Sequence, residues 1–248
     1  MAAPRAVFGM PSVWDSTFQS HEAAFRSIEL LRSVTDDLVT FTKDDQRDQV
    51  RVANALADVS SSAMLDVILL VGNRRGVGAM RIARGIFEIG VLASYLAKNP
   101  KDVSDYVDFG VVEGWRHLQT LEKHMPGSVS PELIKQAEGE YNRIKPRFSN
   151  PQGRVQNRWT TKSVRQISEE VGRLNIYEIA YSAASELHHV PLIGVIGHEL
   201  DWSKEALFIA YGSLLDAVVA LREASDYKEK DFCDRLNKAI ADFDLLRK

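Results

Sequence analysis

The sequence holds a single cysteine and carries no strong excess of charge of either sign. Cys233 is the only thiol among 248 residues, so one chain cannot form an internal disulfide, and we expect a reducing compartment. The formal net charge is −3, so whole-molecule electrostatics favour neither nucleic acid nor an acidic membrane. Hydrophobic residues make up 45% and charged residues 26%, which is typical of a globular protein.

Long hydrophobic runs are also lacking. The stretches 63–72 and 85–97 are the most apolar, and Asp66 and Glu88 interrupt them, so neither reaches the roughly 18–20 residues of a membrane span. Residues Met1–Pro11 have no apolar core, so we do not expect a signal peptide there. We therefore expect a cytoplasmic protein with no membrane partner.

Apolar residues recur with helical spacing along most of the chain. Asn99-Pro100, Pro126-Gly127 and Gly172 interrupt this pattern, and no segment alternates as a strand would. The sequence predicts an all-α bundle of about eight or nine helices, forming one domain over 1–248. The expected helices cover about 14–43, 45–70, 77–97, 101–124, 131–145, 162–171, 175–189 and 203–225, followed by a charged C-terminal helix.

Two of these helices carry a polar stripe on an otherwise apolar surface. On helix 77–97 the stripe lies within roughly 60°, and on helix 175–189 within roughly 80°. A helix that is apolar on all sides is usually buried, so facing stripes would form a buried polar centre for a ligand. A solvent-exposed face and a purely structural network are the alternatives. The stripe residues are Arg81, Arg84, Glu88 and Tyr95, and then Tyr177, Tyr181, Ser185 and His188.

These residues carry a resemblance to a known family. The motif Arg84-x3-Glu88, then Tyr95-Leu96, Trp159 and Tyr177-x3-Tyr181-x3-Ser185-x2-His188, resembles a widespread family of bacterial helical proteins of unknown function. The similarity spans about residues 60–215. It implies an all-helical fold in which these positions are characteristic, and it implies no activity.

Catalytic and metal chemistry find limited support. Ser185 and His188 are one turn apart and Glu88 could orient the histidine, but no nucleophile-elbow motif is present. Glu186-x-x-His189 has the spacing of helical di-metal sites, with His198 as a further ligand, but a second Glu-x-x-His is missing. We expect no metal and no cofactor.

Phosphate or nucleic-acid contact is the other chemistry that the sequence offers. Gly72–Gly78 precedes a helix start, where backbone N–H groups bind anions, although a plain turn is the simpler interpretation. Residues 141–168 contain basic residues and no acid, interleaved with Tyr141, Phe148 and Trp159, which suits phosphates and unpaired bases. A solvated connection that docks on the acidic remainder or on a second subunit is the alternative. The candidate contacts are Arg147, Arg154, Arg158, Lys162 and Arg165.

The sequence thus predicts a helical protein that binds a ligand or partner, without catalysis, through Arg84, Glu88, Tyr181, Ser185 and His188. The alternative is an RNA- or nucleotide-directed enzyme of a bacterial stress or defence system with His188 as acid–base. The Arg-x4–6-His motif of HEPN ribonucleases is absent. A histidine/carboxylate metalloprotein is the second alternative. Amphipathic helices at both ends favour a homo-oligomer.

Overall fold

The computed structural model describes residues 11–178 and 201–246. It divides into two compact units. Asn99–Ser163 forms one, called the hairpin unit here, and the chain before and after it forms the other, the bundle unit. Helices dominate the described residues, where no strand occurs and the only β contact is the isolated Ser149–Val155 bridge. The predicted all-α fold is confirmed.

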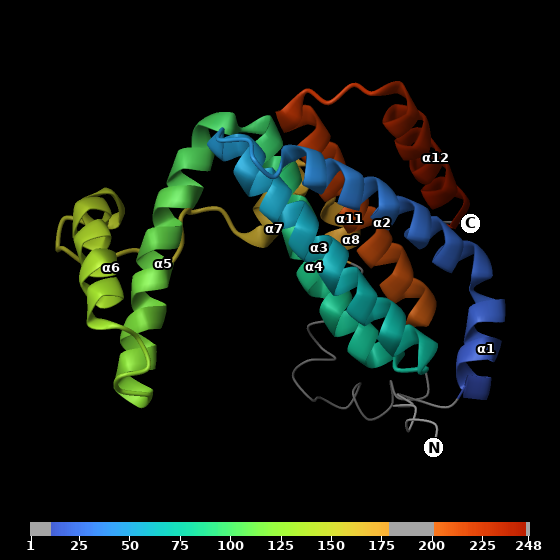
Figure 1. Ribbon diagram of the computed structural model, residues 1–248, viewed down its shortest axis with the longest axis horizontal. Coiled ribbons are helices and arrows are strands. Elements are labelled where there is room, and N and C mark those ends of the chain that lie inside the picture. Colours follow the sequence, from blue (N-terminus) through green and yellow to red (C-terminus); the bar gives the residue numbers. More distant parts are fainter. Residues whose placement is uncertain (1–10, 179–200, 247–248) are drawn as a thin grey trace, which may run out of the picture. The chain divides into compact units, whose positions relative to one another are not determined.

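The bundle unit contains helices from both halves of the chain (Figure 1). Its core is α11, which packs along α4 and α3, while α2 and α12 pack against each other. The described helices are α1 (Pro11–Ser20), α2 (Glu22–Thr42), α3 (Asp48–Gly72), α4 (Gly76–Lys98), α7 (Val164–Glu170), α8 (Leu174–Ile176), α11 (Ser203–Ser225) and α12 (Lys230–Leu246).

The contact between α4 and α11 is close enough to involve backbone atoms. A Cβ placed on Gly90 of α4 would lie 2.5 Å from the Ser213 carbonyl oxygen of α11. A Cβ on Gly76 would lie 2.9 Å from the backbone nitrogens of Trp202 and Ser203. Only glycine lacks that atom, so the sequence permits two helices to touch at positions where any side chain would separate them.

The prediction of one long helix over 14–43 is wrong. The chain bends at His21, whose φ of −125° and ψ of 22° are not helical, and so separates α1 from α2. The expected apolar stripe is buried only in its middle, as at Leu31, while Phe18 and Phe41 are exposed. Phe41 instead contacts the ring of Tyr227 at a tilt of 43°, with ring centroids 4.4 Å apart.

Helix α3 is long and apolar enough to cross a membrane by length and composition alone, which the sequence analysis did not anticipate. In the structure its side chains Met64, Val67 and Val71 are buried, and it packs along α4, α11 and α2.

The hairpin unit is built from η1 (Pro100–Asp102), α5 (Val103–His124), α6 (Pro131–Ile144) and η2 (Lys145–Phe148). Ser130 caps α6 as its sequence predicts, because its hydroxyl oxygen accepts a hydrogen bond from the Leu133 N–H at 3.3 Å. Phe109, Val112, Ile144 and Phe148 form a core of its own. The single-domain organisation of residues 1–248 stays a prediction.

Candidate functional site

The predicted stripe on α4 does not share one environment. Arg84 and Glu88 form an i,i+4 ion pair, with Arg84 Nε 3.1 Å from Glu88 Oε1, and their side chains are 25% and 40% exposed. Arg81 is exposed, whereas Tyr95 is buried. A pair this open to water is worth a few tenths of a kcal/mol to the helix, so Arg84 and Glu88 do not form a dry centre by themselves.

The opposite stripe falls mostly outside the described residues. Tyr177 follows α8 and is half-buried. The other candidates on this side are outside the described ranges, so the facing of the two stripes stays a prediction: Tyr181, Ser185, Glu186, His188, His189 and His198. Within residues 11–178 and 201–246, no group of three His, Cys, Asp or Glu side chains is placed to hold a metal ion.

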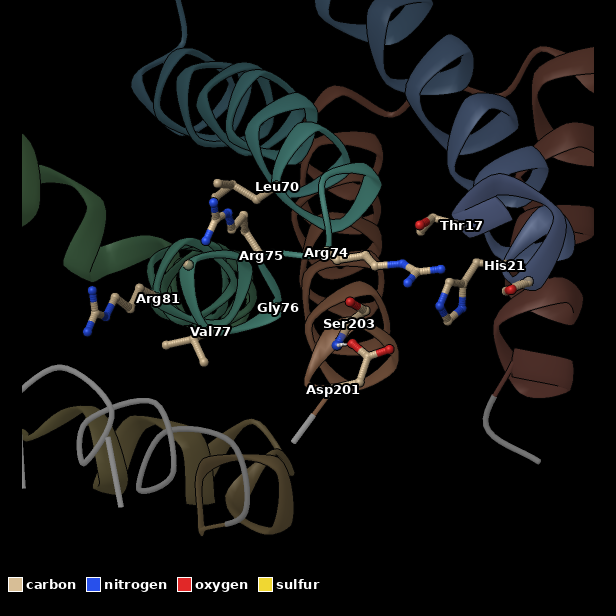
Figure 2. Close-up of a pocket in the computed structure, with 12 residues that line it drawn as sticks. Thr17, His21, Leu70, Arg74, Arg75, Gly76, Val77, Arg81, Asp201 and Ser203 are labelled. Atoms are coloured by element: carbon tan, nitrogen blue, oxygen red, sulfur yellow. Dashed lines mark hydrogen bonds between the residues drawn. The ribbon is translucent and has the colours of Figure 1, made fainter. Parts of the chain in front are cut away.

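Arg81 instead lines a pocket at the end of the bundle unit where α4 and α11 begin. This arginine pocket, of about 870 Å³, is lined by Arg74, Arg75, Arg81, His21, Asp201 and Ser203, among others. In Figure 2, Arg74 extends from the α3–α4 turn toward His21, above Asp201 and Ser203. Arg75 lies beside Leu70, and Arg81 lies on the side of α4 away from Arg74, so the three arginines point in different directions. The pocket therefore surrounds the start of α4 with cationic side chains.

The local fold holds Arg74 in place. Helix α3 ends at Gly72, and Arg74 adopts a left-handed φ of 54°. The N–H groups of Arg74 and Arg75 donate to the carbonyls of Val71 and Leu70, both at 2.8 Å. The Arg74 guanidinium then donates to Ser16 Oγ at 2.8 Å. The predicted turn between the two helices is confirmed, and it fixes the position of a guanidinium group at the pocket wall.

Two helix N-termini meet at this pocket, because Gly76 begins α4 against Trp202 and Ser203 at the start of α11. Each carries a partial positive charge. Ser203 is the first residue of α11, and the Asp201 carboxylate accepts the Ser203 N–H at 3.0 Å. Hydrogen bonds from Ser203 lower the pKa of the Asp201 carboxyl, and the charges of His21 and Arg74 lower it further. Asp201 is thus an anion that this positive end stabilises.

The acid-free basic segment is less available than its composition suggested. Arg147 pairs with Asp105 and Asp108, and Arg165 with Glu178 at 3.1 Å. Lys162 is half-buried and has a polar or electrostatic partner, whereas Arg154 and Arg158 are exposed. The charges counted as phosphate contacts are therefore partly neutralised by acids elsewhere in the sequence.

The aromatic residues of that segment are used in packing. Phe148 is buried edge-on against Phe109 at 5.2 Å between ring centroids, and Trp159 meets Tyr106 in the same way at 5.6 Å. Tyr141 stacks on Trp115 at 5.7 Å. Rings that build a core cannot also serve as open platforms for bases.

An ion pair that sequence reasoning missed lies inside the bundle unit. Arg173, in the turn between α7 and α8, donates from Nε to Asp216 Oδ2 of α11 at 2.8 Å, and its Nη2 pairs with Oδ1. The side chains are 37% and 15% exposed. Burial raises the pKa of the Asp216 carboxyl, against the opposing effect of Arg173. One signal was available: Asp216 is the only charged residue between Glu205 and Arg222 of α11.

Comparison with known proteins assigns a family and no activity. Neither the curated proteins nor the solved structures contain a match to the chain. The model of a family of unknown function, DUF5677, matches residues 51–200, which include most of α3, together with α4, the hairpin unit and α7–α8. More than half of the chain is matched, and the resemblance inferred from the Arg84 and Tyr177 motifs is confirmed at the level of an uncharacterised family. The chain belongs to the family of unknown function DUF5677.

Proposed function

We propose that the protein is a non-catalytic ligand-binding module, which binds a phosphate-bearing anion in the arginine pocket. The observation that carries this proposal is a charge imbalance. Among the described lining residues, Arg74 and Arg75 carry positive charge and Asp201 alone carries negative charge; Arg81 also lines the pocket but has an interaction partner of its own and is not counted in this imbalance.

The helix geometry adds to this imbalance. Like ends of two helix dipoles repel, and those of α4 and α11 approach until a Cβ on Gly76 would be 2.9 Å from the next backbone. An anion at a helix N-terminus is typically favourable by about 0.3–1 kcal/mol in exposed positions. A second anion beside Asp201 would therefore relieve repulsion that the fold already contains.

Phosphate is the anion best matched to these groups. Guanidinium groups bind phosphate oxygens through two parallel N–H bonds, and the first N–H groups of a helix add further donors. Val77 and Gly78 of α4 line the pocket, and Gly78, which has no Cβ, lets a ligand approach the backbone closely. The single cysteine fits a cytoplasmic setting, where phosphorylated small molecules and nucleotides are abundant, and we include that location in the proposal.

The proposal is tested by titrating the protein with pyrophosphate and with ATP in a calorimeter. Arg75→Ala removes an exposed cation from the pocket wall and should weaken binding about tenfold, the typical effect of losing one charge-assisted contact. The matched control is Arg51→Ala. Arg51 is an exposed arginine near the opposite end of α3, and its loss changes net charge equally without touching the pocket.

Replacing the acidic residue of the pocket, Asp201, should change the affinity for pyrophosphate in the opposite direction. Asp201→Asn retains a side chain that caps helices well but removes the competing negative charge, so pyrophosphate should bind more tightly. The proposal is wrong if Arg51→Ala weakens binding as much as Arg75→Ala, or if the unsubstituted protein binds neither anion at low salt.

A further inference from the structure

The Arg173–Asp216 pair forms the wall of two cavities. One, of about 210 Å³, is lined by Phe87, Phe208, Phe243 and Asn175 together with both charged residues, and is called the ring-lined cavity here. The other, of about 340 Å³, also contacts Arg173 and Asp216. A protein interior of normal packing density has few voids larger than a water molecule. An ion pair that only holds α8 on α11 is therefore expected to be enclosed by packed side chains, and this pair borders two cavities instead.

The ring-lined cavity is electrically balanced. Among its described lining residues, Arg173 and Asp216 are the only ones that ionise at neutral pH, and they carry opposite charges. A ligand with a net charge would find no counter-charge there, and an unpaired charge in a partly buried site is costly. The cavity thus differs in kind from the arginine pocket, where cations predominate.

The ion pair still offers hydrogen bonds to a neutral ligand. Arg173 uses Nε and Nη2 on Asp216, and Nη1 carries two further N–H donors. Each carboxylate oxygen accepts more than one hydrogen bond. Arg173 and Asp216 therefore bring further N–H donors and carboxylate acceptors to the lining of a cavity that also includes aromatic rings of α4, α11 and α12.

From this arrangement we propose that the ring-lined cavity binds a small, uncharged aromatic molecule carrying an amide-like donor and acceptor, such as a carboxamide or a heterocyclic base. Phe208 and Phe243 stack on each other with ring centroids 4.8 Å apart, so the ring of the ligand packs against the parts of these rings and of Phe87 that line the cavity. Its polar edge bonds to Arg173 and Asp216. This site is separate from the proposed anion site and does not depend on it.

Three probes of equal size and different charge test the proposal: benzamide, benzoate and benzamidine. Each is titrated into the 15N-labelled protein at millimolar concentration and followed by two-dimensional NMR. Benzamide should shift the amide signals of Gly212 and Arg173, with benzoate and benzamidine at least about tenfold weaker. Equal binding of the three probes, preference for a charged one, or benzamide shifts that cluster elsewhere would overturn the proposal.

Two variants sharpen the test. Asp216→Asn leaves Arg173 without its counter-charge, so benzoate should become the preferred probe; an unchanged ranking contradicts the proposal. Gly212→Ala places a Cβ 2.8 Å from Phe243 Cζ, which displaces a wall of the cavity and should weaken benzamide several-fold. Gly85→Ala, in open space on α4, is the control.

Two further observations keep the outcomes distinct. Circular dichroism shows whether Asp216→Asn folds. If it does not, the proposal is decided by the affinity ranking of the three probes in the unsubstituted protein and by the benzamide affinity of Gly212→Ala. Pyrophosphate titration of Gly212→Ala should match that of the unsubstituted protein, so failure of either site is recognised without reference to the other.

Discussion

Asp201 serves two structural purposes with one side chain. Its carboxylate closes the open N-terminus of α11 through the Ser203 N–H, and it offsets the positive charge of Arg74 and His21. Both effects favour the ionised form, which is why the pKa of this carboxyl is lowered from its usual 3.8. A group whose folded-state pKa is lowered stabilises the fold above its unfolded-state pKa, and that contribution is lost as pH falls through the folded-state pKa.

Replacing this residue should therefore change stability in a pH-dependent way. Asp201→Ala is expected to cost about 1 kcal/mol of unfolding free energy at about pH 7, as for a lost helix cap. The difference should shrink as pH falls below about 4, where the carboxyl becomes protonated in the unfolded chain, and it should vanish once pH has passed the lowered pKa of the folded state. Urea unfolding measured at several pH values checks this. A difference that stays constant across pH would show that the charge contributes nothing.

At the scale of elements, the α4–α11 contact depends on Gly90. Its missing Cβ leaves room for the backbone of Ser213, and backbone atoms cannot rotate away as a side chain can. Gly90→Ala should therefore push the two helices apart and cost about 3 kcal/mol, the upper part of the range for overpacking. Gly85→Ala, five residues earlier on the same helix in open space, should instead stabilise α4 by about 1 kcal/mol. Chemical denaturation of both variants measures the contrast, and a loss of similar size at both positions would contradict it.

Helix ends were predictable where a local residue determines them. Ser130-Pro131 starts α6, and the Gly72–Gly76 turn separates α3 from α4, because caps, proline and glycine act within a few residues. The bend at His21 has no such marker, so periodicity alone merged α1 and α2. Arg173 looked like a turn residue because its partner Asp216 lies 43 positions away. A pairing across that distance is set by how α8 packs on α11, which spacing along the chain does not encode.

The candidate site shows the same division. Arg81 was visible as a candidate ligand-binding residue and the Gly72–Gly78 turn as an anion-compatible feature, since both are local. The approach of Ser203 to Gly76 brings a second helix N-terminus, with its partial positive charge, to the pocket. This approach could be found only from the folded structure. Likewise, the basic charge of the hairpin segment was visible, but its neutralisation at Arg147 by Asp105 and Asp108 was not.

For the whole molecule, the two compact units imply two levels of cooperativity. The core of the hairpin unit is small, so Phe148→Ala, which should cost about 3 kcal/mol, is expected to open that unit preferentially. Hydrogen exchange should then accelerate in α5 and α6 while α3, α4 and α11 stay protected.

The exposed Met125 in the same unit supplies the control, because Met125→Ala removes no buried contact and should leave exchange unchanged. If Phe148→Ala accelerates exchange equally in α11, the chain unfolds as one cooperative domain, in agreement with the single-domain prediction.

The two glycine contacts of α4 have a mechanical consequence. Gly76 and Gly90 are separated by roughly 21 Å along the helix, and at both points α4 rests on the main chain of α11 with no side chain between them. Two helices in backbone contact at two distant points cannot slide or tilt freely against each other. The α4–α11 pair therefore forms a rigid body within the bundle unit. Motion that accompanies ligand binding there must arise in the helices and turns attached to this helix pair.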